Sequence, residues 1–449
     1  MDRLYTLSHR FIILFLVIIA APTYAQIANE DIKLLANDAA SNDWFGISVA
    51  INNGIIAVGS HRDDVYGEDS GSVYLFDAAT GTQTNKLLPS DGEIGDLFGH
   101  SLAIDNGIVA IGAPFDDDNG TDSGSVYLFD ANTGIQIMKL LPTDGEEGEK
   151  FGKSIAIDNG IVAIGAWFDD DRGFSSGSAY LFDTVTGVQI AKLLPSGSSV
   201  ADYFGWSIAI NNGLVAVGSI GDNGGWGIKS GSVYLFDAST GTQIDKLSPN
   251  DGASYDEFGY SVAMSDDTIA IGAVFDDDNG AASGSVYLFD LPSRVQKNKL
   301  TPSNGMFEDR FGFSISIDDN IIVVGSIGDT ENGFLAGSSY LFNASTGSQI
   351  AKLLPSDGER YDYFGWSTAI ENGIVTVGAG SDDPGGSAYI FDFNCPADLC
   401  FDLTLDFFDV SEFLTLFAAQ DPTADFYTDG FFDFFDVSAF LTAFAAGCP

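Results

Sequence analysis

A Phe-Gly pair recurs seven times at an almost constant spacing, and this repeat limits the folds available to the chain. The pairs begin at residues 45, 98, 151, 204, 258, 311 and 364, so every spacing is 53 residues except one of 54. Periods near 50 residues that consist of short strands and turns are typical of β-propellers. The repeat therefore predicts an all-β fold, a seven-bladed β-propeller with one unit per blade.

Each unit contains four strand signals. In the unit that begins at Phe98, the segment FGHSLAI ends at Asn106-Gly107, a dipeptide typical of two-residue hairpin turns. The segments GIVAIGA and GSVYLFD follow, and a fourth strand ends with KLLP at Pro142. We therefore expect four-stranded antiparallel blades, with the recurring glycines placed where backbones approach closely.

The two ends of the repeat predict how the ring closes. The segment IKLL at residues 32–35 resembles the fourth strand, and Lys33 lies 53 residues before Lys86, yet no Phe-Gly pair precedes it. The last unit stops after GSAYIFD and has no fourth strand of its own. We expect the N-terminal strand, residues 31–36, to complete the last blade of a propeller domain spanning 26–394 and to remove its open edge.

The first 25 residues are expected to be a signal peptide. Two arginines precede an apolar run at residues 11–21, and small residues occupy positions that signal peptidase reads, before Gln26. The run is short for a membrane span. The sequence therefore predicts a secreted or cell-surface protein without a membrane span in the mature chain; a retained N-terminal anchor is the alternative.

The charge of the chain is strongly negative. It has 64 Asp and Glu against 18 Lys and Arg, a formal net charge of −46, which excludes nucleic acid as a partner and favours solubility. In an up-and-down blade the second connection and the link between blades share one end, so the FDDDNG-type loops should form one acidic face. The candidate ligand face consists of Asp116, Asp117, Asp118, Asp169, Asp170, Asp171, Asp276, Asp277 and Asp278. Solvated carboxylates and a site for Ca²⁺ or a cationic partner are the two alternatives.

No convincing catalytic constellation emerges. After the predicted signal peptide only His61 and His100 remain, too few for a zinc site or a Ser/His/Asp triad, and the carboxylates recur blade after blade. We therefore predict no catalytic residues, no organic cofactor and no enzymatic activity. The residues that break the symmetry of the repeat are His61-Arg62, Trp167, Arg172, and Trp226 with Lys229, and exposed aromatic residues could stack on sugar rings.

The seven Phe-Gly pairs, together with steps such as IGAP at residues 111–114, resemble the FG-GAP repeats of the integrin α-chain head over roughly residues 30–392. The resemblance implies an extracellular propeller that binds ligands or mediates adhesion. Integrin blades carry a calcium loop in the hairpin between the first two strands. Here that hairpin is a bare Asn-Gly, Asp266-Asp267 or Asp319-Asn320, with no room for an oxygen cage.

A second, shorter repeat occupies residues 395–449. The segment DLCFDLTLDFFDVS is echoed 27 residues later by DFYTDGFFDFFDVS, and helical patterns follow at 412–419 and 439–446. Acidic residues at positions 1, 5, 9 and 12 ahead of a helix follow the calcium-loop pattern.

This tail resembles a dockerin, a small α-helical module of paired calcium loops that binds a cohesin. The resemblance implies calcium as cofactor, a cohesin-like or cell-surface scaffold protein as partner, and the ligands Asp398, Asp402, Asp406, Asp409, Asp425, Asp429, Asp433 and Asp436. Position 3 is Cys400 or Tyr427, and the turn glycine is present only as Gly430, so the first loop is expected to be weak or degenerate. Two loops held by Phe packing without metal are the alternative.

Cys395 and Cys448 bracket the tail, a sensible place for a disulfide in an oxidising compartment. In the chain-entropy model such a bond would stabilise the module by roughly 4 kcal/mol. Pairing of Cys395 with Cys400 is the alternative connectivity.

The predicted function is that of a secreted or cell-surface, non-catalytic binding or adhesion protein. The propeller would bind an unknown protein or carbohydrate, and the tail would attach it in a calcium-dependent way. The alternative is a secreted carbohydrate-active enzyme or lectin attached to an assembly by the same tail.

Overall fold

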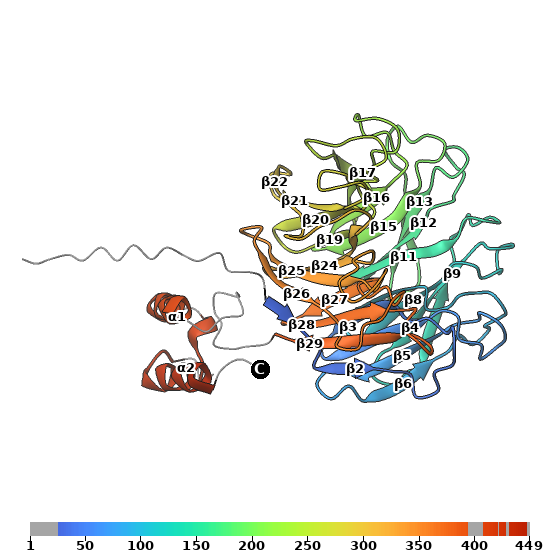
Figure 1. Cartoon of the computed structure of the whole chain (residues 1–449). Coiled ribbons are helices and arrows are strands. Elements are labelled where there is room, and N and C mark those ends of the chain that lie inside the picture. Colours follow the sequence, from blue (N-terminus) through green and yellow to red (C-terminus); the bar gives the residue numbers. More distant parts are fainter. Residues whose placement is uncertain (1–25, 394–406, 421, 428–430, 447–449) are drawn as a thin grey trace, which may run out of the picture.

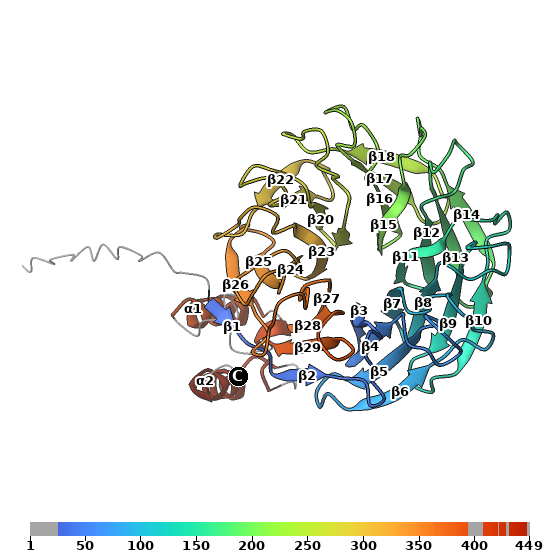
Figure 2. The same ribbon diagram turned by 45° about the vertical axis from the view of Figure 1, so that its right-hand side comes forward.

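A computed structural model of the chain describes residues 26–393, 407–420, 422–427 and 431–446. The predicted signal peptide, residues 1–25, lies outside these ranges. Seven sheets surround a common axis (Figure 2). The first blade consists of β3 (Phe45–Asn52), β4 (Ile55–Ser60), β5 (Ser72–Asp77) and β6 (Gln83–Leu87), paired antiparallel in that order. The predicted propeller of seven four-stranded antiparallel blades is confirmed.

The next five blades repeat this order. Their strands are β7 (Ser101–Asp105), β8 (Ile108–Ala113), β9 (Ser125–Asp130) and β10 (Gln136–Leu140); β11 (Phe151–Asp158), β12 (Ile161–Ala166), β13 (Ser178–Asp183) and β14 (Gln189–Leu193); β15 (Phe204–Asn211), β16 (Leu214–Ser219), β17 (Ser232–Asp237) and β18 (Gln243–Leu247); β19 (Val262–Met264), β20 (Thr268–Ala273), β21 (Ser285–Asp290) and β22 (Gln296–Leu300); β23 (Phe311–Asp318), β24 (Ile321–Ser326), β25 (Ser338–Asn343) and β26 (Gln349–Leu353). Contacts between first strands of successive blades place these strands nearest the axis.

The N-terminal segment closes the ring. The last blade contains β27 (Ser367–Glu371), β28 (Ile374–Ala379) and β29 (Ser387–Asp392), and β2 (Ile32–Leu34) pairs antiparallel with β29 as its fourth strand. The preceding β1 (Gln26–Ala28) pairs in parallel with β26 of the neighbouring blade. Both strands appear as blue arrows beside the orange blades in Figure 1. The N-terminal segment therefore joins two blades from the far end of the chain.

Adjacent blades meet at the Phe-Gly glycine. The Ser101 hydroxyl on β7 donates a hydrogen bond to the carbonyl oxygen of Gly152 in the next blade, 2.7 Å away. A Cβ added to Gly112 on β8 would clash with that same carbonyl oxygen. At the closing joint, the Ser367 hydroxyl donates to the Gly46 carbonyl at 2.9 Å. The same type of serine-to-glycine contact therefore joins neighbouring blades within the ring and the first blade to the last.

The core lies between neighbouring blades. Phe98 is fully buried and packs edge-on against Tyr127 and Phe129 of β9, with ring centroids 5.4 and 5.9 Å apart. The same aromatic trio recurs in each unit, and residues such as Leu75 and Leu87 of the preceding blade complete the cluster. Because each cluster needs two blades, burial of apolar surface favours the closed ring.

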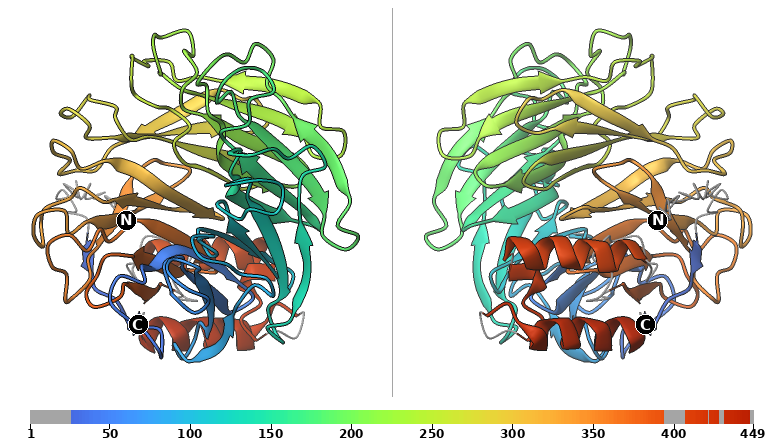
Figure 3. Two further views of the ribbon diagram at one scale, coloured as in Figure 1. Left: turned by 90° about the vertical axis from the view of Figure 1, so that its right-hand side faces the viewer. Right: turned by 90° about the vertical axis from the view of Figure 1, so that its left-hand side faces the viewer.

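The tail contains two helices, α1 (Phe407–Ala419) and α2 (Phe434–Ala446), and a short 3₁₀ turn, η1 (Pro422–Ala424). The helices lie side by side (Figure 3), and Phe413 stacks on Phe440 with ring centroids 4.1 Å apart. No helix among the described residues is long and apolar enough to cross a membrane.

Each tail helix begins five residues before the predicted start. The Asp433 carboxylate accepts a hydrogen bond from the amide of Phe435, and the Asp436 carboxylate accepts one from the amide of Asp433. This reciprocal arrangement is a capping box, which starts a helix ahead of its apolar positions. The predicted boundaries at 412 and 439 are therefore wrong, because the DFFDVS segment belongs to the helix and its cap.

Candidate functional site

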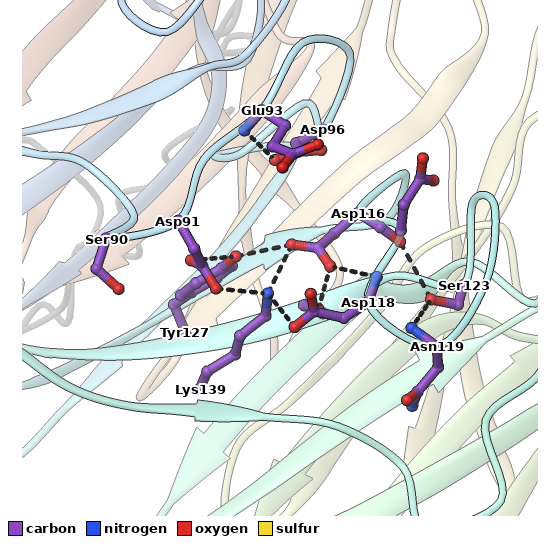
Figure 4. A network of polar contacts seen from close by, with 12 residues as sticks. Ser90, Asp91, Glu93, Asp96, Asp116, Asp118, Asn119, Ser123, Tyr127 and Lys139 are labelled. Carbon is purple, nitrogen blue, oxygen red and sulfur yellow. Dashed lines mark hydrogen bonds and ion pairs between the residues drawn. The ribbon is translucent and has the colours of Figure 1, made fainter.

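The first aspartate of each acidic loop points into its own blade, and all of these aspartates are buried except Asp382, which is half-buried. Asp116 accepts hydrogen bonds from the Tyr127 hydroxyl at 2.7 Å, the Lys139 ammonium at 2.9 Å and the Ser125 hydroxyl at 2.8 Å (Figure 4). The last two strands set this geometry, since Tyr127 on β9 lies opposite Lys139 on β10. The other six Asp–Tyr–Lys sets are Asp63–Tyr74–Lys86, Asp169–Tyr180–Lys192, Asp222–Tyr234–Lys246, Asp276–Tyr287–Lys299, Asp329–Tyr340–Lys352 and Asp382–Tyr389–Lys33.

The electrostatics of this set hold both groups in their charged forms. Burial alone would lower the pKa of Lys139, but hydrogen bonds to Asp118, Asp116 and Asp91 outweigh burial and raise it. Burial alone would raise the pKa of Asp116, but its bonds to Lys139 and Tyr127 prevail and lower it. The recurring lysine therefore ties the acidic loop to the fourth strand and serves the scaffold.

Most of the remaining aspartates of the predicted ligand face form contacts within their own loop or blade. Asp117 and Asp170 accept hydrogen bonds from backbone amides within the same loop, at 2.7 and 2.5 Å. Asp118, Asp171 and Asp278 each form an ion pair with the lysine of their own blade, at 2.6, 2.6 and 2.5 Å, and Asp277 is exposed. Across the described ranges, no three acidic, His or Cys side chains group in a way that suits a metal ion. The calcium alternative for this face stays a prediction.

The tail brings some of its predicted calcium ligands together. Asp409 and Asp436 are buried, and the Asp436 carboxylate accepts hydrogen bonds from the amides of Asp433 and Tyr427, which lower its pKa. Asp425, at position 1 of the second loop, shares a side-chain hydrogen bond with Asp436 at position 12. The predicted ligands Asp398, Asp402, Asp406 and Asp429 and the predicted disulfide Cys395–Cys448 lie outside the described residues.

A pocket of about 640 Å³ is lined by the seven residues that follow the Phe-Gly pairs. They are Ile47, His100, Lys153, Trp206, Tyr260, Phe313 and Trp366. Trp44, His61, Arg310, Ile327 and Tyr363 complete the lining, which contains no acidic residue. His61 lies two residues before Asp63, so the pocket opens at the same end of the ring as the acidic loops.

The local backbone explains why each unit contributes these side chains. Between Phe151 and Ser154 the register of β11 against β12 shifts, so Lys153 falls in a bulge outside the regular ladder. The residue before each phenylalanine has a positive φ, for example 57° at Trp44 and 54° at Arg310. Every unit therefore turns two side chains out of its sheet where the first strand begins.

Aromatic residues form a belt around much of the pocket. Trp206 contacts Tyr260, Tyr260 contacts Phe313, and Phe313 contacts Trp366, with centroid distances of 5.4, 5.3 and 4.9 Å. Trp366 meets Trp44 at 5.7 Å and Trp44 meets His61 at 5.7 Å, both edge-on. We call these side chains, Trp206, Tyr260, Phe313, Trp366 and Trp44, the aromatic belt.

The polar groups of the pocket lack protein partners. Lys153 has no carboxylate within ion-pair distance among the described residues, and its ammonium lies 5.0 Å from the ring of Trp206. Burial and the nearby charge of Lys150 lower the pKa of Lys153 to about 8. Burial, with Arg62 and Lys153, lowers the pKa of His61 to about 3, so this imidazole is neutral at pH 7. Nδ1 of His61, Nδ1 of His100 and Nε of Arg310 are buried without a hydrogen-bond partner in the described structure.

Sequence reasoning located only part of this pocket. Of the symmetry-breaking residues, His61 lines it and Trp167 packs against Trp206 at 4.8 Å, whereas Arg172, Trp226 and Lys229 do not line it. The sequence-based prediction did not include the seven residues that follow the Phe-Gly pairs as a group. The available signal was that the residue after each Phe-Gly pair changes in almost every unit while its neighbours repeat.

Comparisons with known proteins identify the repeat. The FG-GAP repeat family matches residues 29–76, 82–129, 135–182, 188–236, 242–289, 295–342 and 348–391. No curated protein matches the chain. Among solved structures, the computationally designed Ika8 protein is similar over 81% of this chain and 100% of its own, with 15% identity and a TM-score of 0.47.

The Asp–Tyr–Lys sets predict a large loss of stability when the lysine is removed. Lys139→Met leaves the buried Asp116 without its cation, so we expect the free energy of unfolding to fall by about 3 kcal/mol, measured by urea denaturation. Arg172→Met is the matched control, because Arg172 is exposed and forms no ion pair within the described part of the chain. Equal stability of the two variants would show that the set does not hold the blade.

A second carboxylate in each unit is buried without a cation. Asp96 accepts a hydrogen bond from the amide of Glu93 at 2.7 Å (Figure 4), and burial raises its pKa to about 6. The pKa values of its equivalents are also raised by burial, to about 6 at Asp202, Asp256, Asp309 and Asp362 and to about 7 at Glu149. Because these pKa values exceed those of the unfolded chain, the groups favour the fold at low pH. This contribution is lost as pH rises through about 4 to 6 for the aspartates and up to about 7 for Glu149.

This ring of carboxylates predicts a pH-dependent effect of Asp96→Asn. The amide oxygen can still accept the bond from Glu93 and carries no charge, so the variant should have a higher Tm than the parent at pH 7.5. The gain should shrink towards pH 4.5, where Asp96 is protonated in the parent as well. Thermal melts at both pH values test this, with Asp277→Asn as the control at an exposed aspartate. A gain of the same size at both pH values would refute the buried charge as its cause.

Proposed function

This chain belongs to the FG-GAP repeat family, and on that premise we propose that it is a secreted or cell-surface, non-catalytic binding or adhesion protein. The observation that carries the proposal is the pocket at the propeller axis. The seven units are nearly identical where they build the scaffold, and they differ where they line this pocket. A concave site lined by aromatic residues with a few polar groups is the usual form of a ligand site.

The chemistry of the pocket supports binding more than catalysis. His61 and His100 contact each other edge-on at 5.8 Å, and both have pKa values lowered by burial. The lining offers no carboxylate that could orient either imidazole as a general base. A lectin is the form of the alternative function that the aromatic belt favours, because aromatic rings pack well against the apolar faces of sugars.

The tail is proposed as the attachment module. The meeting of Asp425 and Asp436, at positions 1 and 12 of the second loop, supports calcium binding there. Helix α2 exposes Phe434 and Leu441, which are 75% and 50% exposed and line one shallow groove with Val437. Together with the dockerin resemblance, these features support calcium-dependent docking to a cohesin-like or cell-surface scaffold protein.

Location outside the cell rests on three features. Residues 1–25 have the pattern of a secretory signal, the cysteines around the tail suit an oxidising compartment, and the charge of −46 suits a soluble exported protein.

A cell-attachment assay tests this division of roles. It compares the full chain with a chain that ends at Phe393, each added to cells of the source organism. The full chain should bind the cell surface in millimolar Ca²⁺ and be released by a chelator, whereas the shorter chain should not attach. Leu441→Asp in the full chain should reduce attachment about tenfold or more, and the exposed Arg172→Asp in the propeller should not. Calcium-independent attachment, or equal attachment of both chains, would contradict the role of the tail.

A further inference from the structure

We propose that the central pocket binds a carboxylated sugar, a uronic acid unit at the end of a glycan. The sugar ring would pack on the aromatic belt, and its carboxylate would face Lys153 and Arg310. This inference rests on the proposed binding function and adds the chemistry of the ligand.

The first support is the separation of charge across one end of the ring. Seven lysines of the blades are paired with carboxylates, whereas the pocket contains Lys153 and Arg310 and no acidic residue. Neither of these two cations has a carboxylate within ion-pair distance in the part of the chain that the structure describes. In a chain of net charge −46, two half-buried cations without anions mark a place for an external anion.

The second support is the unused hydrogen-bonding capacity beside these cations. His61 is 5% exposed, and its Nδ1, the Nδ1 of His100 and the Nε of Arg310 lack partners in the described structure. Buried polar atoms normally find partners, so these three are suited to a ligand that carries hydroxyl groups. A sugar supplies both donors and acceptors at closely spaced positions.

The third support is the aromatic belt itself. It extends from Trp206 to Trp44 along one side of the pocket, and Lys153 lies next to it, over Trp206. A ligand that combines a flat apolar face with one carboxylate can contact the belt and the cation together. The volume of about 640 Å³ lies within the range of small-molecule sites.

The acidic loops around the pocket select how the ligand enters. A polyanion lying across this end of the ring would meet aspartates of the acidic loops, such as Asp117, Asp170 and Asp277 in three of the seven blades. A single terminal carboxylate at the axis meets the cations instead, and exposed charges more than about 8 Å away are screened at physiological salt. The arrangement therefore favours a chain end over the middle of a polymer.

Calorimetry with the full chain tests the proposal. The probes are a short galacturonate oligosaccharide and its fully methyl-esterified form, which has the same rings and no charge. We expect the acid to bind at least tenfold more tightly than the ester. Lys153→Met should remove most of that difference, Trp366→Ala should weaken both probes, and Lys297→Met, on β22 away from the pocket, should change neither.

Proton uptake on binding distinguishes a direct contact between the ligand carboxylate and Lys153 from an indirect effect of the Lys153→Met substitution. Lys153 faces Lys150, His61 and His100 within the protein and Arg310 across the pocket, all cationic or neutral groups. A bound carboxylate should raise the pKa of Lys153 from about 8. At pH 8 about half of the free Lys153 is already charged, so binding should take up as much as about half a proton per site. Calorimetry in two buffers of different ionisation enthalpy measures this uptake, which Lys153→Met should abolish.

A thermal melt of each variant checks that it is folded. If Lys153→Met does not fold, Arg310→Met takes its place. Equal affinity for acid and ester, or no binding of either at millimolar concentration, would overturn this inference. In those cases calcium-dependent attachment of the full chain would leave the proposed function standing.

Discussion

The close contact between adjacent blades at the Phe-Gly glycine is the constraint on which the rest of the structure depends. The Gly152 carbonyl accepts the hydroxyl of Ser101 and lies where a Cβ on Gly112 would be. The same contact at Gly46 closes the ring. In four blades the first strand begins with a register shift at this close approach, and the shift turns the residue after the Phe-Gly pair out of the ladder towards the axis. Closure of the scaffold and construction of the pocket thus have one geometric cause.

The positions that repeat and the positions that vary have different roles. Asp116, Tyr127 and Lys139 recur in every blade, and their charges are satisfied within the blade. Lys153 and Arg310 each occur once among their equivalents, and their charges have no carboxylate partner in the described structure. A cation that the fold pairs in every unit contributes to stability, whereas a cation that the fold leaves unpaired in one unit is available to a ligand. Most of the acidic end of the ring is therefore scaffold, and the chemistry available for recognition gathers at its centre.

The sequence predicted the fold well and the site poorly, for physical reasons. Strand alternation and Asn-Gly turns are local signals, and the 53-residue offset between Lys33 and Lys86 predicts the closing strand from the sequence alone. From the sequence alone Asp116 belongs to an acidic face that is either solvated or a cation site. Its burial depends on Tyr127 and Lys139, which reach it only once two strands pair in register. Helix α2 begins early because Asp433 and Asp436 cap it, although both residues also fit the calcium-loop pattern. The pocket needed seven distant positions to be compared with one another, since no single unit contains it.

The central claim is that the pocket at the axis, and not the acidic loops, is the place of recognition. A crystal structure of the full chain soaked with a galacturonate oligosaccharide tests it most directly. We expect a terminal uronate in the pocket, its carboxylate within hydrogen-bond distance of Lys153 or Arg310 and its ring against Trp206 or Trp366. An ordered sugar bound only at the acidic loops around Asp117 and Asp170, with the pocket empty, would contradict it.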